Sequence, residues 1–285
     1  MKFDKNTKIL IVGLGLIGGG YAEALTNKGY EVGAITRKPS TIDYALKKGI
    51  IKHGNTEITK EYVEQFDLIV FSLYPHVFVE WLEQYGSFIK KGAVVTDVTG
   101  VKVSIINKVK ALLPDGVEFI GAHPMAGKEV YGIENADSNI FLGANYIITP
   151  SEDNSPESIE VAKKLGEEIG FRQISILTPE KHDEMIGFLS QLTHCIAVSL
   201  MTCKENPEKF VDYTGDSFRD LTRIAKINED MWSELFVMNK ETLLCQMDLF
   251  INNFMALRDY LENEEIEKMK EMMRLSTNNR KYFDK

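Results

Sequence analysis

Short apolar runs alternate with helical patterns along the first part of the chain. The first run, Ile9–Val12, is mostly β-branched and leads directly into a glycine-rich turn, Gly13–Gly18, of the form G-x-G-x-x-G. A helical pattern containing Ala and Leu follows over Tyr21–Leu25. This order predicts a strand buried on both faces, then a tight turn and the N-terminus of a helix.

Further strands and helices are expected from the same alternation. Pro75 suits the first turn of one helix, and Pro156–Ile169 is predicted to form another. Strands that alternate with helices predict a doubly wound (Rossmann) parallel sheet of the α/β class, with active residues at the C-terminal ends of the strands. The other expected strands are Glu31–Thr36, Asp67–Ser72, Ala93–Asp97, Val117–Gly121, Asn145–Thr149 and Phe171–Leu177.

The pattern changes after Pro179, because from there to the C-terminus only helical periodicity is present. His182–Met201 is expected to form one long helix, and Met231–Tyr260 contains another that is strongly apolar on one face. We therefore expect a dinucleotide-binding domain over residues 1–178 and an all-helical substrate and dimerisation domain over residues 179–285. The excess of apolar surface predicts a homodimer formed through the C-terminal helices.

The glycines of the turn suit a dinucleotide. Gly13 permits the turn, Gly15 lets the backbone approach a pyrophosphate, and Gly18 lets the helix pack closely on the strand. The N–H groups at the helix N-terminus then face the phosphates. A structural turn with no cofactor is the alternative. The residues expected to bind the cofactor are Gly13, Gly15, Leu16, Ile17, Gly18, Thr36, Arg37, Lys38 and Ser72.

The end of the second predicted strand favours NADP over NAD. An NAD site usually has a carboxylate there, about 20 residues past the glycine turn, to bind the ribose 2′-hydroxyl. This chain has Thr36 at that place, followed by Arg37 and Lys38. A 2′-phosphate is attracted by such cations and repelled by a carboxylate. A solvated loop is the alternative, and NAD stays possible.

Composition narrows the classes of function. The chain has 285 residues, 44% hydrophobic and 26% charged, which is ordinary for a soluble globular protein with room for two domains. Its formal net charge of −9 argues against nucleic acid or an anionic membrane as a partner. The N-terminus has no apolar signal core, and no apolar run is expected to reach the length of a membrane span. The 3 cysteines have no C-x-x-C spacing, which indicates the reduced thiols of a cytoplasmic protein, and no metal-ligand spacing is found.

Three segments carry candidate chemistry. His123 follows a predicted strand and is flanked by glycines, so a neutral imidazole there can accept a proton or polarise a hydroxyl. A structural hydrogen bond in a loop is the alternative. Arg219 and Arg223 are four residues apart and would share a helical face, where an anionic ligand would relieve their repulsion. Pairing with nearby aspartates is the alternative for the arginines.

The third segment is a polar stripe on the predicted long helix. Gly187, Ser190, Gln191 and His194 are spaced at i, i+3, i+4 and i+7, so they share one face of an otherwise apolar helix. Buried polar groups need partners. The stripe either lines a cleft against the cofactor domain or is satisfied within the core.

Taken together, the motifs resemble one family. They are G-L-G-L-I-G-G, H-P-M-A-G-K-E, S-Q-L-T-H and F-R-D-L-T-R-I-A with M-W downstream, and they extend from about Lys8 to Tyr260. The chain resembles the prephenate/arogenate dehydrogenase family of tyrosine biosynthesis. The resemblance implies oxidative decarboxylation of prephenate to 4-hydroxyphenylpyruvate, with hydride transfer to NAD(P)+ and release of CO2 as the ring becomes aromatic.

The resemblance also implies roles for single residues. His123 matches the catalytic histidine that hydrogen-bonds the ring 4-hydroxyl as hydride leaves C4, and Arg223 matches the arginine that holds a substrate carboxylate. His194 and Trp232 match residues on the substrate side. Glu129 and Asp220 resemble an ionic gate near the entrance.

Two departures from the family pattern concern the site. Many members have a serine that assists the histidine, where this chain has Gly100, so either Thr99 or a water is expected to supply that hydroxyl. The helix motif is also altered, with Gln191 and Thr193 in place of His and Pro. Gln191 is counted among the substrate-binding residues.

Because the chain is acidic, a dianionic substrate needs a local cluster of cationic side chains. Lys102, Lys128, Arg219 and Arg223 are the candidates. The alternatives are arogenate as substrate, another two-domain dehydrogenase of the 3-hydroxyacid or pyrroline-carboxylate reductase type, and a non-catalytic NADP-binding module. His123 favours the prephenate/arogenate dehydrogenase family over the other two-domain dehydrogenases. Those enzymes typically rely on a lysine or lack the H-P-x-A-G loop.

Overall fold

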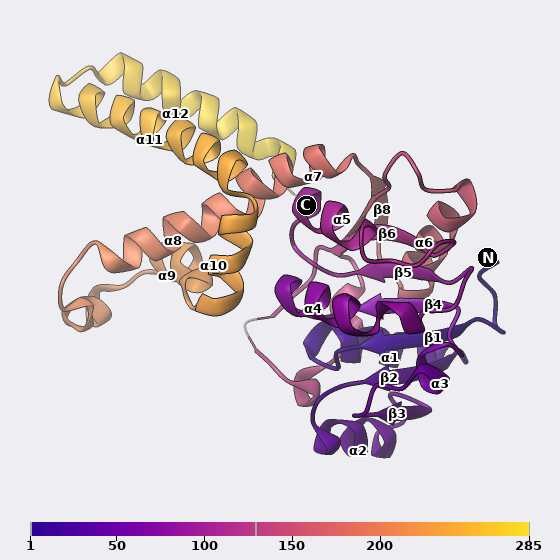
Figure 1. Cartoon of the computed structure of the whole chain (residues 1–285). Coiled ribbons are helices and arrows are strands. Elements are labelled where there is room, and N and C mark those ends of the chain that lie inside the picture. The colour runs from indigo at the N-terminus through magenta and orange to yellow at the C-terminus, as the bar shows by residue number, and fades with distance from the viewer. Residues whose placement is uncertain (1, 129, 285) are drawn as a thin grey trace.

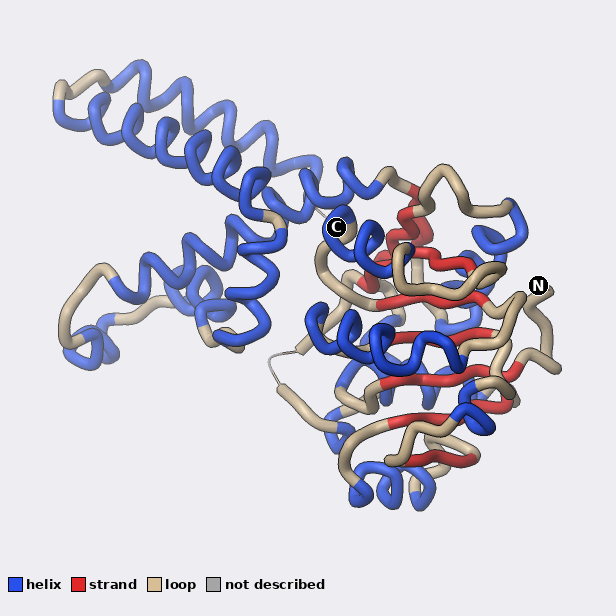
Figure 2. Tube along the Cα trace, in the orientation of Figure 1, coloured by secondary structure: helices blue, strands red, loops and turns tan. Residues whose placement is uncertain are grey.

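The computed structural model describes residues 2–128 and 130–284. Its N-terminal part is an eight-stranded sheet in the order β3-β2-β1-β4-β5-β6-β7-β8, flanked by helices (Figures 1 and 2). The strands are β1 Lys8–Val12, β2 Glu31–Ile35, β3 His53–Asn55, β4 Leu68–Phe71, β5 Val94–Asp97, β6 Glu118–Pro124, β7 Asn145–Thr149 and β8 Gln173–Ile176. The helices of this part are α1 Leu16–Asn27, α2 Pro39–Lys47, α3 Lys60–Val63, α4 Pro75–Tyr85, α5 Val103–Lys110 and α6 Pro156–Ile169.

Both faces of the sheet are buried, which explains the continuous apolar run of β1. Ile9 and Ile11 pack into a core cluster with residues of α1 and α6. Leu10 and Val12 pack on the opposite face with residues of α4 and α5. Side chains alternate between the two faces of a strand, so a strand covered by helices on both sides needs apolar residues at every position.

The predicted α/β class is confirmed, with one exception to the parallel arrangement. β7 runs antiparallel to β6, and its pairing reaches Pro124. The strand expected to end at Gly121 therefore continues three residues further, and His123 lies within β6 rather than after it. β3 was not expected, because its His-Gly-Asn sequence has no apolar pattern.

The C-terminal part consists of helices joined by turns and loops, with no strand among its described residues. It contains α7 Pro179–Ile186, a π-helical segment Gly187–Leu192, α8 Thr193–Thr202, α9 Asp216–Thr222, α10 Glu229–Met238, α11 Lys240–Glu262 and α12 Ile266–Arg280. Short 3₁₀ segments lie at Pro207–Tyr213, Arg223–Ala225 and Lys281–Phe283. α11 and α12 form a hairpin that extends away from the sheet (Figure 1).

The second long helix expected from the sequence is divided at Asn239. This residue leaves the helical conformation at φ −113° and ψ 25°, between α10 and α11. Its buried amide donates hydrogen bonds to the Asp183 carbonyl oxygen at 3.0 Å and to Gln191 Oε1 at 2.7 Å. The break therefore lies where α7 and the π-helical segment contact α11.

The stretch Pro179–Thr202 is long and apolar enough, by length and composition, to cross a membrane. The expectation that no apolar run reaches that length is wrong by these two criteria. A core helix of a soluble protein meets the same criteria, and this stretch carries the polar Ser190, Gln191 and His194.

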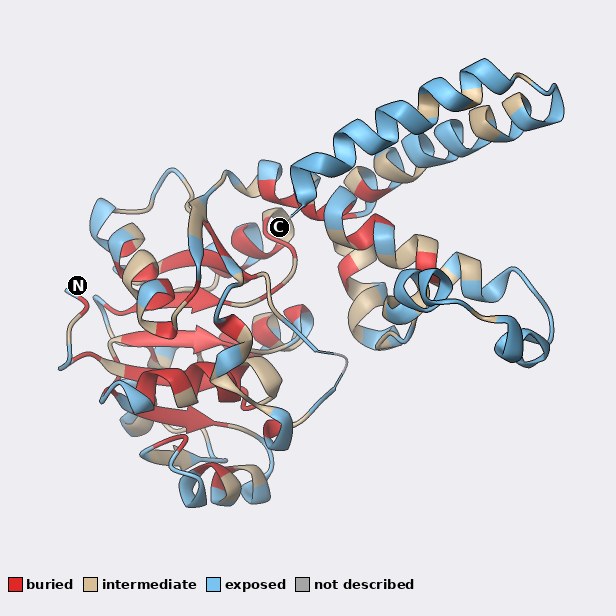
Figure 3. Cartoon of the chain, turned by 180° about the vertical axis from the view of Figure 1, so that it is seen from behind, coloured by how far each residue is buried: buried red, intermediate tan, exposed pale blue. Residues whose placement is uncertain are grey.

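α11 exposes many large apolar side chains, and most of its surface is accessible in this single chain (Figure 3). Phe254 is 62% exposed and its ring stacks on that of Phe250 at 6.1 Å. The other exposed apolar residues of the helix are Leu244, Leu249, Ile251, Met255 and Leu261. Solvent-exposed apolar surface on this scale indicates a protein interface.

Candidate active site

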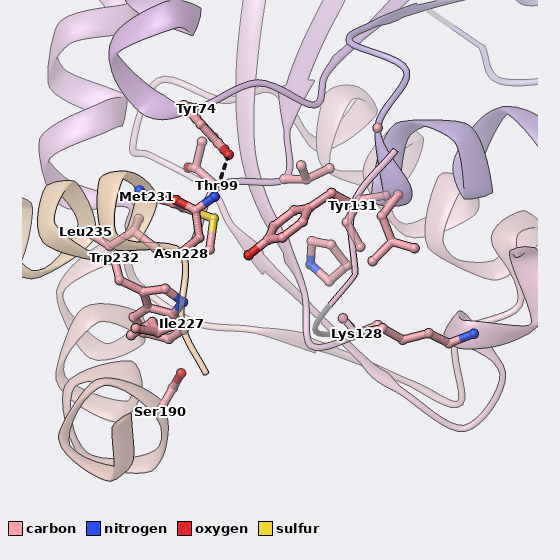
Figure 4. A pocket seen from close by; sticks show the side chains of 18 of the residues that line it. Tyr74, Thr99, Lys128, Tyr131, Ser190, Ile227, Asn228, Met231, Trp232 and Leu235 are labelled. Atoms are coloured by element: carbon pink, nitrogen blue, oxygen red, sulfur yellow. Dashed lines mark hydrogen bonds between the residues drawn. The ribbon is translucent and has the colours of Figure 1, made fainter. Parts of the chain in front are cut away.

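A cavity of about 660 Å³ lies between the sheet and the helical part of the chain (Figure 4). The glycine turn and the ends of β4, β5 and β6 line one side of it, and the helical part lines the other. Tyr74 and Asn228 bridge the two sides through a hydrogen bond of 3.1 Å from the Asn228 amide to the phenol oxygen. The cavity is therefore at the C-terminal edge of the sheet, where a doubly wound fold binds its ligands.

The glycine turn has the geometry that a dinucleotide needs. Gly13 has φ +98°, in the region that favours glycine. A Cβ on Gly15 would meet no atom within 4 Å, so the backbone borders open space at the start of α1. A Cβ on Gly18 would lie 2.0 Å from the Gly13 carbonyl oxygen, which leaves no room for any other residue. Gly15, Leu16, Ile17 and Ser72, four of the residues expected to bind the cofactor, line the cavity.

The end of β2 lies beside this turn. The Gly13 N–H donates to the Ile35 carbonyl oxygen at 2.8 Å, and Thr36 follows directly. Thr36, Arg37 and Lys38 do not line the cavity, and Arg37 and Lys38 are exposed. This is the position at which a Rossmann domain meets the adenosine ribose of its cofactor.

His123 lines the cavity from β6 and makes one imidazole contact away from it. Its Nδ1 lies 2.9 Å from His182 Nε2 on α7. Burial, followed by the neighbouring His182 and Lys102, holds the pKa of His123 well below the usual histidine value. His123 is therefore neutral at physiological pH and can act as a base.

Lys102 does not reach the cavity, so the structure does not place it among the substrate contacts. Its side chain is fully buried, and Nζ donates to Asp97 Oδ2 at 2.6 Å and to Thr99 Oγ1 at 3.1 Å. Asp97 ends β5, and a buried carboxylate there requires a buried cation. Lys102 was expected among the substrate contacts because of its charge, but that charge is paired with Asp97.

Thr99 lines the cavity, but its hydroxyl belongs to the same buried cluster. The hydroxyl hydrogen-bonds Asp97, and it accepts from Lys102. Gly100 lies beside His123 and Leu235, because a Cβ there would be 3.9 Å from His123 Cε1 and 3.4 Å from the nearest Leu235 atom. The choice between Thr99 and a water as the source of the hydroxyl stays a prediction.

His194 and Trp232 line the helical side of the cavity together. Their ring centroids are 3.7 Å apart, and His194 Nδ1 lies 2.9 Å from the Ser190 carbonyl oxygen. Gln191 also lines the cavity, but its amide serves the core: Nε2 donates to the Leu235 carbonyl oxygen at 3.1 Å and Oε1 accepts from Asn239. The polar stripe thus divides between the cavity and the core.

Three cationic side chains line the cavity: Lys128, Arg223 and Lys226. No Asp or Glu lines it among residues 2–128 and 130–284. Arg219 is not a lining residue, because its guanidinium donates to Asp216 at 2.6 Å and to the Thr214 carbonyl oxygen. The aspartate-pairing alternative therefore holds for Arg219 in this chain.

Asp220 and Glu129 were expected to form an ionic gate at the entrance. Asp220 is exposed and does not line the cavity. Glu129 lies outside the residues that the structure describes. Tyr131 projects its phenol into the cavity from the loop after β6 (Figure 4). This residue was not among the predicted site residues.

His182 and Lys226 were also missed. His182 was treated only as the start of a helix, and its proximity to His123 depends on how α7 crosses the end of the sheet. Lys226 follows the T-R-I-A segment by one residue, and its spacing of three from Arg223 was a usable signal.

Comparison with known proteins decides the family. The prephenate dehydrogenase nucleotide-binding domain family matches residues 21–175, and the prephenate dehydrogenase dimerization domain family matches residues 178–275. The chain belongs to the prephenate dehydrogenase family. It is therefore a dehydrogenase that uses a nicotinamide dinucleotide, and the predicted family is confirmed.

Individual proteins that are similar to this chain support the same family. The prephenate dehydrogenase of Bacillus subtilis (strain 168) is 30% identical over 269 residues, which is 92% of this chain and 72% of that protein. The cyclohexadienyl dehydrogenase of Zymomonas mobilis is 28% identical and covers 90% of this chain and 89% of that protein. The crystal structure of the A. aeolicus prephenate dehydrogenase with hydroxyphenyl propionate and NAD+ has a TM-score of 0.89 and 29% identity, covering 99% of this chain and 100% of that one.

Proposed function

We propose that this member of the family oxidises prephenate to 4-hydroxyphenylpyruvate and CO2, with NADP+ preferred as the hydride acceptor. The observation that carries the proposal is the cavity itself. It brings a neutral histidine, His123, and three cationic side chains to the glycine turn of a dinucleotide-binding domain. This arrangement suits the oxidation of an anionic alcohol.

The residues of the glycine turn fit a dinucleotide. Gly15 leaves the space for a pyrophosphate, and the N–H groups at the start of α1 face that space. When bound, the nicotinamide ring accepts a hydride. The protein side of the reaction is then positioning of the substrate and acceptance of one proton.

His123 accepts that proton in our proposal. The hydroxyl on the carbon that loses hydride becomes more acidic as the hydride leaves, and the unprotonated imidazole nitrogen hydrogen-bonds it. The C–CO2 bond breaks, its electron pair completes the aromatic ring, and the resulting phenolate oxygen takes the proton back from His123. Arg223, with Lys128 or Lys226, holds the carboxylates, which keep their charge until one leaves as CO2.

The lining charges favour prephenate over arogenate. Prephenate carries a keto group and two negative charges, whereas arogenate carries an additional ammonium group. The cationic side chains of the lining, Lys128, Arg223 and Lys226, attract the two negative charges of prephenate and repel the added ammonium group of arogenate. Arogenate is therefore the weaker substrate in this proposal.

Assembly and location follow from the same evidence. The match to a dimerization domain supports a homodimer. We infer that the interface is formed by the exposed apolar side chains of α11. We also infer that the protein is soluble and cytoplasmic, without a nucleic-acid or membrane partner.

The direct test is a spectrophotometric assay of NAD(P)H formation. Prephenate and arogenate are each supplied with NAD+ and with NADP+, and kcat/KM is measured for the four combinations. We expect the highest value for prephenate with NADP+. No turnover of either substrate would overturn the proposed activity, and a higher value for arogenate would overturn the argument from the lining charges.

A further inference from the structure

His123 is the end of a hydrogen-bonded chain that leads away from the cavity into the protein. Its Nδ1 is 2.9 Å from His182 Nε2, and His182 Nδ1 is 2.7 Å from Asp183 Oδ1. His182 is fully buried and Asp183 is 3% exposed. The ends of the chain are therefore the cavity on one side and a buried carboxylate on the other.

The Asp183 carboxylate accepts from three directions. The backbone N–H of Lys102 donates to Oδ1 at 2.8 Å, and the backbone N–H of Val103 donates to Oδ2 at 2.9 Å. These are N–H groups at the start of α5, where a negative charge is stabilised by the helix. Both oxygens thus serve as acceptors, so the contact with His182 requires an N–H on His182 Nδ1.

This contact decides the proton positions along the chain. Burial lowers the pKa of His182, with the Asp183 contact opposing the shift, so the ring is neutral near pH 7. A neutral imidazole with its proton on Nδ1 has an unprotonated Nε2. That nitrogen can only accept from His123, whose proton must then lie on Nδ1.

We propose that His182 and Asp183 are a positioning pair that holds His123 in the Nδ1–H tautomer and so presents its unprotonated Nε2 to the cavity. This proposal rests on the proposed function, in which His123 accepts the substrate proton. Neither member of the pair needs to touch the substrate. The groups that face the pair from neighbouring elements are Lys102 at the start of α5 and Asp97 at the end of β5, and these two neutralise each other in a buried ion pair.

The tautomer matters because the opposite one cannot act as a base toward the substrate. With its proton on Nε2, His123 would donate to the substrate hydroxyl instead of accepting from it. In the serine protease triad, an Asp→Asn change that inverts the histidine tautomer lowers kcat by about 10⁴-fold. Asp183→Leu is the change to make here, because it removes the acceptor of the His182 Nδ1–H and leaves both imidazoles free to take the opposite tautomer. An asparagine could keep its amide oxygen at the Oδ1 site, where it would still accept from the Lys102 N–H and from His182.

The kinetic test compares three variants and one control variant with wild-type protein. We expect Asp183→Leu and His182→Leu to lower kcat by about 10²-fold to 10⁴-fold, with KM for prephenate changed less than about threefold. His182→Gln keeps an amide oxygen that can accept from His123, so its kcat should lie between those of His182→Leu and the wild type. Glu184→Gln is the control, because Glu184 pairs with Lys181 on the exposed face of α7. Unchanged kcat in both Asp183→Leu and His182→Leu would overturn the proposal.

A second measurement does not depend on turnover. The chain has 5 histidines, and ¹⁵N NMR of histidine-labelled protein reports which ring nitrogen carries the proton, with His123→Asn assigning the signal. We expect His123 of the wild-type protein to be protonated on Nδ1. Protonation on Nε2 overturns the proposal even if the enzyme is active, whereas an inactive protein with the Nδ1–H tautomer contradicts only the proposed function.

Discussion

The indole of Trp232 stacks on the imidazole of His194, with ring centroids 3.7 Å apart and planes tilted by 30°. Trp232 comes from α10 and His194 from α8, so the stack joins two helices at the wall of the cavity. His194 is also oriented by its contact with the Ser190 carbonyl oxygen. We propose that this pair contacts the ring of the substrate.

Removing the indole of Trp232 should raise KM for prephenate more than it lowers kcat. Aromatic pairs contribute about 0.5–1.5 kcal/mol, which corresponds to about a 2- to 10-fold rise in KM for prephenate in Trp232→Leu. Trp232→Phe keeps a ring and serves as the control. Steady-state kinetics decide the matter, and a fall in kcat at constant KM would contradict the assigned role.

Cofactor preference should follow the charge at the end of β2. Thr36→Asp places a carboxylate where the 2′-phosphate is expected. We therefore expect kcat/KM for NADP+ to fall by about tenfold or more, while kcat/KM for NAD+ stays the same. Thr36→Ser keeps the hydroxyl and should leave the preference unchanged. Equal or better use of NAD+ by the wild-type protein would refute the predicted preference for NADP+.

The two arginines of the R-x-x-x-R segment should behave differently. Arg223 lines the cavity, so Arg223→Ala should raise KM strongly, by the loss of about 2–5 kcal/mol of binding, with a smaller effect on kcat. Arg219→Ala is the matched control, because Arg219 pairs with Asp216 outside the cavity. Equal effects of the two substitutions on KM would show that the cavity as described is not the substrate site.

The pH dependence of kcat should report His123. The acting form is neutral, so activity falls as pH drops through its pKa, and burial places that pKa below the ordinary value of about 6.5. The acid limb should therefore lie below pH 6.5. His123→Asn should lower kcat by about 10²-fold to 10⁴-fold, leave KM nearly intact and remove the limb. A variant that retains both normal turnover and the limb would assign the base to another group.

Dimerisation should depend on α11. Phe254→Glu places a charge within its exposed apolar surface, and we expect a monomer by light scattering at micromolar concentration. Lys52→Glu, on the exposed surface of the dinucleotide-binding domain, is the control and should remain dimeric. A dimeric Phe254→Glu protein would indicate an interface elsewhere.

The sequence predicted the sheet and the cofactor turn well because both depend on local patterns. Ile9–Val12 must be apolar at every position, and only glycine fits at Gly18. β3 and the antiparallel β7 were not predicted as such, because strand direction and edge pairing depend on contacts between distant segments. The division of the last long helix at Asn239 has the same cause, since its amide bonds to Asp183 and Gln191.

The site was predicted less completely, for reasons that are also physical. Arg219 and Arg223 were expected to share a helical face, but α9 ends at Thr222 and Arg223 begins a 3₁₀ segment. Lys102 was counted as a substrate cation because its pairing with Asp97 inside the protein has no signature in charge alone. His182 comes within hydrogen-bond distance of His123 only because α7 packs across the end of the sheet.

The π-helical segment Gly187–Leu192 gives its helix one place where a change in length can be absorbed. A π turn accommodates one residue more than an α turn, so deleting a single residue here would favour an ordinary α-helix. The lost residue and the tighter turn nearly cancel, so the helix downstream would keep the orientation that places His194 at the cavity. We therefore expect deletion of the exposed Phe188 or Leu189 to be tolerated, whereas a deletion inside α8 would rotate every later position of that helix by about 100°.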